Sequence, residues 1–258
     1  MKNISILGCG WLGEPLALSF LEEGFTVKGS TTTEEKIALL EASQIEAYLV
    51  NISEFEEYDA FLHSDILVIA ITSKDIDGFE NLMQQIENSP IQKVLFISST
   101  SVYPNLNAEV TEATKTKESA LSEIEELFRQ NNYFETTIIR FAGLLGPDRH
   151  PGKWFSDGRK IPHPKGVVNM IHQEDCIEII HEIIAQNCWD TTFNACSNHH
   201  PTRKDFYTIA KLSYDSTVPE FEEKEALTYK MVSSKKLQEV LDYTFIHDDL
   251  LKVFIEAF

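Results

Sequence analysis

The stretch NISILGCGWLG, residues 3–13, decides the fold. A short apolar strand runs directly into the pattern G-x-G-x-x-G, which opens a helix. Gly8 allows the tight turn, Gly10 lets the backbone approach a pyrophosphate, and Gly13 lets the helix pack on the strand. The helix N-terminus adds N–H donors that suit an anion. The order of strand, loop and helix therefore predicts a dinucleotide-binding turn. Its expected cofactor contacts are Gly8, Gly10, Trp11, Leu12 and Gly13.

Strand-like and helix-like segments alternate from this loop to residue 141. The strands are short apolar runs, and the stretches between them have the length of helices. Continuous apolar strands that alternate with helices are typical of a parallel sheet covered on both faces. We therefore expect an α/β fold, a doubly wound parallel Rossmann sheet. Its strands are predicted at 3–7, 26–30, 45–50, 66–71, 94–98 and 136–141, with a further short strand near 192–195.

The pattern changes after Arg140. Residues 143–166 are rich in glycine, proline and basic residues and have no clear periodicity, and further helices close the chain. Doubly wound sheets bind ligands at the carboxyl ends of their strands, so we expect a small C-terminal lobe to contact the substrate there. The predicted domains are a Rossmann domain of residues 1–146 and 167–198 and a substrate lobe of residues 147–166 and 199–258.

Composition excludes several classes of function. The 22 Lys and Arg stand against 41 Asp and Glu, and the resulting charge of −19 repels the phosphate backbone of a nucleic acid. The longest apolar run, at 66–71, is far below the about 20 residues that cross a bilayer, so no membrane partner is expected. No secretory leader is recognisable. The four cysteines lack zinc-ligand spacing, so we expect free thiols, no metal site and a cytoplasmic location.

The end of the second strand bears on the choice of cofactor. A site for NAD carries Asp or Glu about 20 residues after the loop, on the ribose 2′-hydroxyl. This chain has Ser30, Thr31 and Thr32 there, and no carboxylate before Glu34. Hydroxyl groups at a helix N-terminus suit a 2′-phosphate, so we expect NADP(H) to be favoured over NAD(H). Lys36 is the nearby cation.

Two neighbouring segments add expectations. Thr32 and Glu35 have the spacing of a capping box, which would start the second helix. At the end of the 66–71 strand, Ala70 and Thr72 complete the expected cofactor contacts.

Later segments carry a family resemblance. Residues 96–104 read FISSTSVYP, 139–147 read IRFAGLLGP and 169–175 read NMIHQED, and FN at 193–194 precedes PTR at 201–203. Together and in this order they resemble the extended short-chain dehydrogenase/reductases, the NAD(P)-dependent epimerase/dehydratases. The resemblance implies hydride transfer on a sugar-like or nucleotide-sugar hydroxyl/keto substrate. The usual loop of that family is G-x-x-G-x-x-G, so the chain is similar to an atypical subgroup.

The resemblance also implies catalytic positions. In that family a Ser orients the substrate, a Tyr is the general acid/base, and a Lys spaced as Tyr-x-x-x-Lys lowers the pKa of that Tyr. Ser99 matches the Ser, but the place of the Tyr falls on Lys117, and no Tyr-x-x-x-Lys lies on that helix. Lys117, Tyr103 and a substrate-bound water are the candidates for moving the proton. The motif at Tyr207 and Lys211 is interpreted as a surface helix pair.

A basic island lies in the segment 148–165. Five cations and two anions give it a local positive charge inside an acidic chain. Arg149, Lys153 and Arg159 could bind the phosphate of a small-molecule substrate, because Arg and Lys capture such anions. A solvated loop that neutralises the acidic surface explains the same residues equally well.

Three functions remain open from the sequence. The first is an NAD(P)-dependent enzyme of the epimerase/dehydratase family with a substituted acid/base. The second is a non-catalytic NADP(H)-binding sensor or scaffold, which the loss of two of three catalytic residues would fit. The third follows from a similarity of residues 8–27 to the glycine loop of 3-hydroxyacid dehydrogenases, which the strand count and the Ser99 segment argue against. The oligomeric state stays open.

Overall fold

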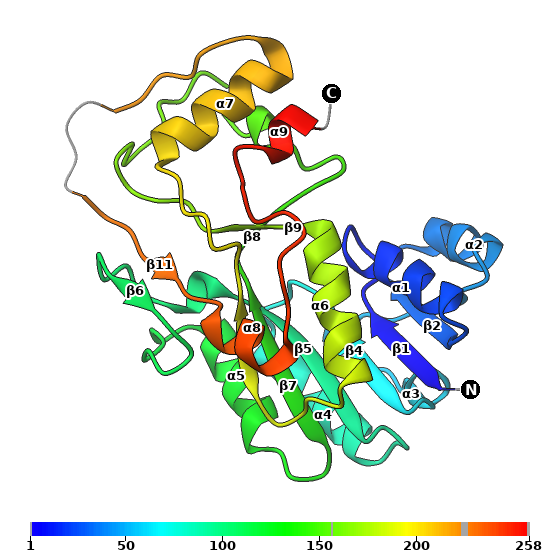
Figure 1. Ribbon diagram of the computed structural model, residues 1–258. Coiled ribbons are helices and arrows are strands. Elements are labelled where there is room, and N and C mark those ends of the chain that lie inside the picture. The colour runs from blue at the N-terminus through cyan, green and yellow to red at the C-terminus, as the bar shows by residue number, and fades with distance from the viewer. Residues whose placement is uncertain (1, 156, 223–226, 257–258) are drawn as a thin grey trace. The chain divides into compact units, whose positions relative to one another are not determined.

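The computed structural model describes residues 2–155, 157–222 and 227–256. Seven strands form the central sheet, and the pairs β1–β2, β1–β4, β2–β3 and β4–β5 are parallel. The predicted doubly wound parallel sheet is therefore confirmed (Figure 1). In sheet order the strands are β10 (Thr192–Ala195), β7 (Glu135–Phe141), β5 (Lys93–Ser99), β4 (Ile66–Ile69), β1 (Asn3–Leu7), β2 (Thr26–Thr31) and β3 (Glu46–Leu49).

The chain divides into two compact units. Unit 1 comprises Met1–Ser98, Glu118–Ile139 and Ile183–Thr192, and unit 2 comprises Ser99–Lys117, Arg140–Glu182 and Phe193–Phe258. This division differs from the predicted domains, because residues 99–117 and most of the 167–198 segment fall in unit 2. Two small parallel sheets hold these segments within unit 2, and their two- and three-residue strands are too short to show a period in the sequence. They are β6 (Glu109–Val110) with β11 (Met231–Val232), and β8 (Gly143–Leu145) with β9 (Met170–His172).

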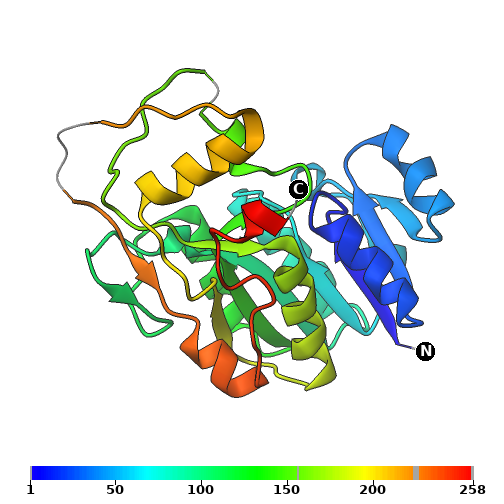
Figure 2. The same cartoon turned by 45° about the horizontal axis from the view of Figure 1, so that its top comes forward.

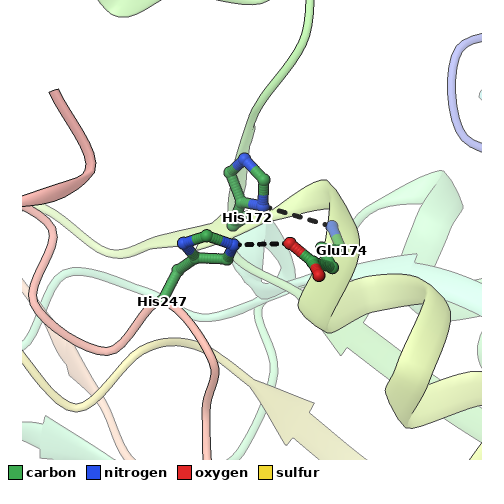
Figure 3. A group of neighbouring side chains, drawn as sticks. All are labelled: His172, Glu174 and His247. Atoms are coloured by element: carbon green, nitrogen blue, oxygen red, sulfur yellow. Dashed lines mark hydrogen bonds and ion pairs between the residues drawn. The ribbon is translucent and has the colours of Figure 1, made fainter. Parts of the chain in front are cut away.

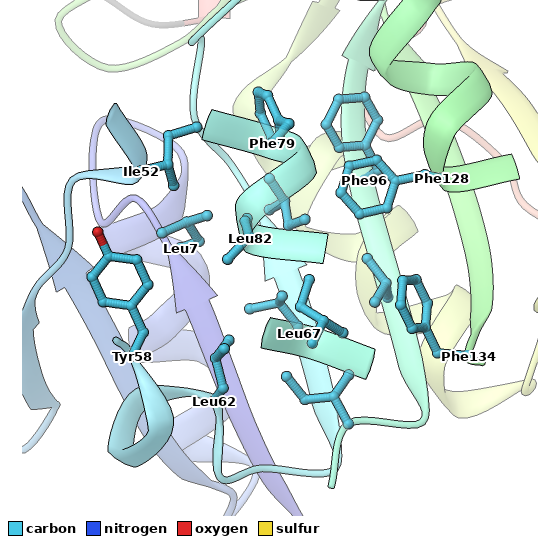
Figure 4. Packing of buried hydrophobic residues seen from close by; sticks show 14 of the residues in the cluster. Leu7, Ile52, Tyr58, Leu62, Leu67, Phe79, Leu82, Phe96, Phe128 and Phe134 are labelled. Atoms are coloured by element: carbon cyan, nitrogen blue, oxygen red, sulfur yellow. The ribbon is translucent and has the colours of Figure 1, made fainter. Parts of the chain in front are cut away.

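Unit 1 is organised around a large apolar cluster. Phe79, Phe96 and Phe128 form its aromatic centre, with Phe96 stacked on Phe128 at 5.0 Å between ring centroids (Figure 4). Full burial of such side chains contributes about 1.5–3 kcal/mol each. The helices that contribute buried residues to this cluster are α3 (Asp59–Leu62), α4 (Ile76–Glu87) and α5 (Ala120–Gln130), together with the short 3-10 turn η1 (Ile52–Glu54).

Side chains start two of these helices. The Asp75 carboxylate accepts a hydrogen bond from the Gly78 N–H at 3.1 Å and so begins α4. Ser119 and Ser122 form a reciprocal capping box at the start of α5. Such caps satisfy N–H groups that a helix cannot pair internally. In the same unit α1 (Gly13–Glu22) contacts β1 and β2, and α2 (Glu34–Ala42) contacts β2 and β3.

Unit 2 has its own apolar cluster. Phe206 on α7 (Arg203–Asp215) meets Phe254 on α9 (Val253–Glu256) at 5.4 Å between ring centroids, and both views show the two helices near each other (Figures 1 and 2). Tyr207 is buried in this cluster, and Lys211, which pairs with Asp215 at 2.6 Å, is buried as well, so the prediction of a surface pair was wrong. The remaining helices named in this unit are α6 (Gln173–Ala185), which extends into unit 1, and α8 (Lys235–Leu241).

Two further expectations concern membranes and thiols. Within the described residues, no helix combines the length and the apolar character that a membrane crossing requires. All four cysteines are free, as predicted.

Candidate functional site

The glycine loop of unit 1 has the geometry that its sequence predicts. Gly8 has φ +98°, and a Cβ there would lie 2.6 Å from the Ile71 side chain. At Gly13 a Cβ would lie 2.1 Å from the carbonyl oxygen of Gly8, so this position requires the close approach that only glycine permits. At Gly10, by contrast, a Cβ would meet nothing within 4 Å, and the residue is exposed. The second glycine therefore faces open space, which leaves room for a ligand beside its backbone.

Ser30 holds this loop from the end of β2. Its Oγ accepts a hydrogen bond from the Gly8 N–H at 2.9 Å, and its carbonyl accepts one from the Cys9 N–H at 2.7 Å. Ser30 is buried. The Ser30 side chain therefore positions the loop, which is a different role from the ribose contact that the sequence predicts for it.

The start of α2 differs from the predicted capping box. The N-cap residue is Thr33, and no side chain caps the helix. The Thr31 Oγ1 instead accepts a hydrogen bond from the Thr33 N–H at 3.1 Å, and Thr32 is exposed. The capping box of Thr32 and Glu35 was therefore wrong, because the chain stays extended through Thr33 and the helix begins at Glu34.

Lys36, a nearby cation in the sequence, lies against the glycine loop in the structure. Its Nζ donates a hydrogen bond to the Cys9 carbonyl at 2.5 Å and pairs with the Glu14 carboxylate at 2.7 Å. The helix α1, which begins at Gly13, has no side-chain cap at its N-terminus. The loop thus combines N–H donors of a helix start with an ammonium group held on its own backbone, and both attract an anion.

The remaining predicted cofactor contacts lie on the same loop or beside it. Leu12 is buried and Trp11 is half-buried. The Ala70 N–H donates to the Leu7 carbonyl at 2.8 Å, and the Ala70 carbonyl lies 3.1 Å from the position of a Cβ on Gly8. Thr72 is exposed two residues further on. Ala70 therefore borders the turn at Gly8.

Cys9 lies inside the loop but is not reactive. The thiol is buried, and burial raises its pKa to about 12 despite the Lys36 charge. Only the thiolate is nucleophilic, so this cysteine packs rather than reacts. A Cβ on Gly29 would lie 2.5 Å from the Cys9 Sγ, which shows how tightly the thiol fits against β2.

In unit 2 the candidate catalytic residues are arranged around one short turn. Ser99 ends β5, and its Oγ accepts a hydrogen bond from the Ser101 N–H at 3.1 Å, which starts the 3-10 turn η2 (Thr100–Val102). The N–H of Lys117 donates to the Val102 carbonyl at 2.9 Å, and the Lys117 side chain is exposed. The fold therefore brings Lys117 to the turn that follows Ser99.

Tyr103 ends this turn in a buried network. Its hydroxyl accepts a hydrogen bond from the Arg140 guanidinium at 2.6 Å and donates one to the Asn194 Oδ1 at 2.8 Å. Glu112 in turn accepts from the Asn194 N–H at 2.7 Å. Burial raises the pKa of Tyr103, and its side chain is only 1% exposed. Because an acid/base must reach its substrate, the structure argues against Tyr103 as the proton-transfer group and gives it a structural role.

Lys230 also contacts this turn, although the sequence gives no indication of it. Its Nζ donates a hydrogen bond to the Tyr103 carbonyl at 3.0 Å across 127 residues of chain. Burial, followed by the charge of Lys117, lowers the pKa of Lys230. No motif surrounds Lys230 in the sequence, so only the tertiary contact could find it.

The basic island contacts acidic and aromatic side chains of unit 2. Arg159 pairs with Asp157 at 2.5 Å and is largely exposed, and the Lys153 ammonium lies over the Tyr214 ring at 5.6 Å. Arg149 is exposed next to the turn at Gly146. Exposed side chains of this kind fit the solvated-loop interpretation, and the anion-binding interpretation stays a prediction.

A further polar cluster lies at the start of α6. Among the described residues His172, Glu174 and His247 bring their ligand atoms within 4.8 Å of one another (Figure 3). The His172 Nδ1 accepts from the Glu174 N–H at 3.3 Å, and the Glu174 carboxylate pairs with the His247 Nε2 at 2.7 Å. Burial and the neighbouring His247 lower the pKa of His172 to about 4. The positive end of a helix disfavours a cation, so we interpret the cluster as a helix cap with a hydrogen bond between His247 and Glu174.

Comparisons with known proteins bear on the family. Residues 3–101 match the family described as NADP oxidoreductase, coenzyme F420-dependent. Protein YeeZ of Escherichia coli strain K12 is 32% identical over 225 residues, which are 80% of this chain and 82% of that protein. The family match includes the glycine loop, and the match to Protein YeeZ covers most of the chain.

Solved structures bear on the fold. A conserved protein of Silicibacter pomeroyi DSS has a TM-score of 0.83 at 20% identity, over 100% of this chain and 98% of its own. The UDP-glucose 4-epimerase of Thermotoga maritima, solved with UDP-glucose, has a TM-score of 0.77 at 16% identity, over 99% and 98%. The dTDP-glucose 4,6-dehydratase of Bacillus anthracis, solved with NAD, has a TM-score of 0.78 at 14% identity, over 99% and 96%.

These likenesses agree with the motifs of the sequence. The segments at 96–104 and 139–147 predicted the extended short-chain dehydrogenase/reductase fold, and the structural matches confirm it. Matches at such low identity establish the fold, whereas function depends on the residues of the site. The chain therefore belongs to the family of Protein YeeZ and has the fold of the NAD(P)-dependent epimerase/dehydratases.

Proposed function

We propose that the protein is a cytoplasmic NAD(P)-binding oxidoreductase or epimerase that transfers a hydride to or from a hydroxyl/keto group of a small molecule. The observation that carries this proposal is the loop at Gly8–Gly13. Its second glycine faces open space, and its helix start has no side-chain cap. These features suit the pyrophosphate of a dinucleotide. The cofactor would supply the hydride, and the chain would bind and orient it.

The substrate would be held by residues of unit 2. Ser99 keeps a hydroxyl proton that it can donate, because its Oγ is the acceptor in its bond with the Ser101 N–H. Lys117 occupies the place where the resemblance puts a Tyr, and its side chain is exposed. We propose that Ser99 orients the reacting oxygen and that Lys117 exchanges the proton in place of the buried Tyr103. The finer assignment to a sugar-like substrate rests on the family resemblance.

We also propose that NADP(H) is favoured over NAD(H). The end of β2 carries no carboxylate for a ribose 2′-hydroxyl, and Lys36 is the cation nearest to the loop. Glu14 shares this ammonium, so a 2′-phosphate would have to compete with a carboxylate for it. Fluorescence titration with NADPH and NADH tests the preference, and the expected result is tighter binding of NADPH. Equal affinities would contradict it.

The second candidate function is a non-catalytic NADP(H)-binding sensor. The burial of Tyr103 favours it, because the tyrosine of the turn cannot reach a substrate. The variant Ser99→Ala distinguishes the two functions. Loss of a robust activity, found by screening NADPH oxidation with carbonyl compounds, would identify an enzyme. A clean nucleotide-binding curve without turnover in that screen would favour the sensor.

A further inference from the structure

The surroundings of Lys230 are unusual for a charged side chain. Lys230 is half-buried, and the one hydrogen bond of its ammonium group within the described part of the chain goes to the Tyr103 carbonyl. No carboxylate of the described residues pairs with it, although the chain has 41 Asp and Glu against 22 Lys and Arg. Burial of an ammonium without a counter-charge costs free energy. Because an ammonium has three N–H donors, two of them are left for a ligand.

Burial lowers the pKa of Lys230, and the charged group that lowers it further is another cation, Lys117. Lys117 is attached through its backbone N–H to the Val102 carbonyl, one residue before Tyr103, and its charge disfavours the protonated form of Lys230. The turn therefore carries two cations that repel each other. An anion placed beside both would offset this repulsion and supply the counter-charge that Lys230 lacks among the described residues.

The lysine is held on a rigid support. The Asn169 side chain donates to the Lys230 carbonyl at 2.9 Å and accepts from the Val232 N–H at 2.8 Å. Asn107 and Tyr229 exchange two hydrogen bonds of 2.9 Å on the other side. The pairing of β6 with β11 continues this support. A pre-positioned backbone lowers the entropy that ligand binding costs, which suits a binding residue more than a surface lysine.

We propose that Lys117 and Lys230 form a binding site for a compact oxyanion, the carboxylate or phosphoryl group of a small-molecule substrate. Each ammonium would donate charge-assisted hydrogen bonds to this group. Ser99, at the start of the same turn, would contact the neighbouring hydroxyl or keto oxygen. The inference that the oxyanion belongs to a substrate rests on the proposed function, whereas the site itself rests on the contacts of the two lysines.

The test uses oxalate and inorganic phosphate as probes of the full chain. Acetylation of individual lysines, followed by mass spectrometry, measures which amines each probe protects, and calorimetry measures the affinity. We expect one or both probes to slow acetylation of Lys230 and Lys117 in a saturable way. Lys115, an exposed lysine of the same segment, should react at an unchanged rate. Protection by oxalate alone would identify a carboxylate site, and protection by phosphate alone a phosphoryl site.

Variants sharpen the test. Lys230→Gln and Lys117→Gln should each weaken binding of the protecting probe by about 10-fold or more, since a hydrogen bond to a charged group contributes about 1.5–3 kcal/mol. Lys115→Gln should bind as the wild type does. Because the Lys117 side chain is exposed, Lys117→Gln should fold. This variant therefore tests the oxyanion site even if Lys230→Gln fails to fold.

Two outcomes would overturn the proposal. One is that neither probe protects Lys230, and the other is that Lys117→Gln binds the probe as tightly as the wild type. A parallel titration with NADPH separates this failure from failure of the proposed function. If NADPH does not bind but oxalate protects Lys230, the nucleotide assignment fails and the oxyanion site stands. If NADPH binds and neither probe protects, the oxyanion site fails alone.

Discussion

Two glycines of the same loop should respond in opposite ways to an added side chain. A Cβ on Gly10 meets nothing within 4 Å, so Gly10→Val should fold normally. Surface substitutions of this kind usually change the free energy of unfolding by less than about 0.5 kcal/mol. The new side chain would nevertheless fill the space that the pyrophosphate needs, so NADPH binding should be lost.

Gly13 provides the contrast. Its Cβ would lie 2.1 Å from the Gly8 carbonyl oxygen, so the loop backbone must move by about 0.9 Å to reach even the 3.0 Å that real Cβ contacts seldom undercut. Overpacking of this kind costs about 1–3 kcal/mol. For a chain of this size about 1 kcal/mol lowers Tm by about 2–4 °C, so Gly13→Ala should melt about 2–12 °C below the wild type.

Thermal melts with and without NADPH measure both effects. A nucleotide at 100 times its Kd stabilises a protein by about 2.7 kcal/mol, which corresponds to a rise of about 5–11 °C for the wild type. Gly10→Val should keep the Tm of the free protein and lose this rise. An unchanged rise in Gly10→Val would show that the loop is not the nucleotide site. Wild-type stability in Gly13→Ala would refute the close-approach argument.

Three further predictions follow from single contacts. Lys36→Met should weaken NADPH binding by about 10-fold and NADH binding much less, because one charge-assisted contact to the 2′-phosphate is lost; equal losses in the two titrations would contradict the NADP(H) preference. Tyr103→Phe should lower the free energy of unfolding by about 1–3 kcal/mol in urea titrations, because buried partners of the hydroxyl lose their hydrogen bond, and a stability equal to the wild type would argue against the network. Below pH 6.5 the unfolded chain protonates His172 while the folded chain, with a pKa of about 4, does not, so stability is lost as pH falls between these values. His172→Gln lacks this loss, so its free energy of unfolding relative to that of the wild type should rise as the pH falls from 7 to 4.5. Urea midpoints that change in parallel for the two proteins would contradict the lowered pKa of His172.

Several features could be predicted because they depend on neighbours in sequence. The glycine loop is one: the turn at Gly8 requires a positive φ, and Gly13 requires the absence of a side chain, so the residue types reveal the backbone. The strands are another, since buried parallel strands must be continuous apolar runs. The parallel central sheet, six of its seven strands and the family resemblance therefore followed from the chain alone.

Other features depend on which distant residues the topology brings together. The Ser30 hydroxyl reaches Gly8 across 22 residues, and this contact turned a predicted ligand contact into a support for the loop. The fold buries Tyr103 against Arg140, which no local pattern shows.

Lys230 is the strongest case, because its contact with Tyr103 spans 127 residues. The two short strands that position it, β6 and β11, have two residues each and no recognisable period. Local sequence determines backbone conformation and periodic burial. The charge, burial and partners of a side chain depend on contacts made across the folded chain, so only the tertiary structure decided which polar groups could act together.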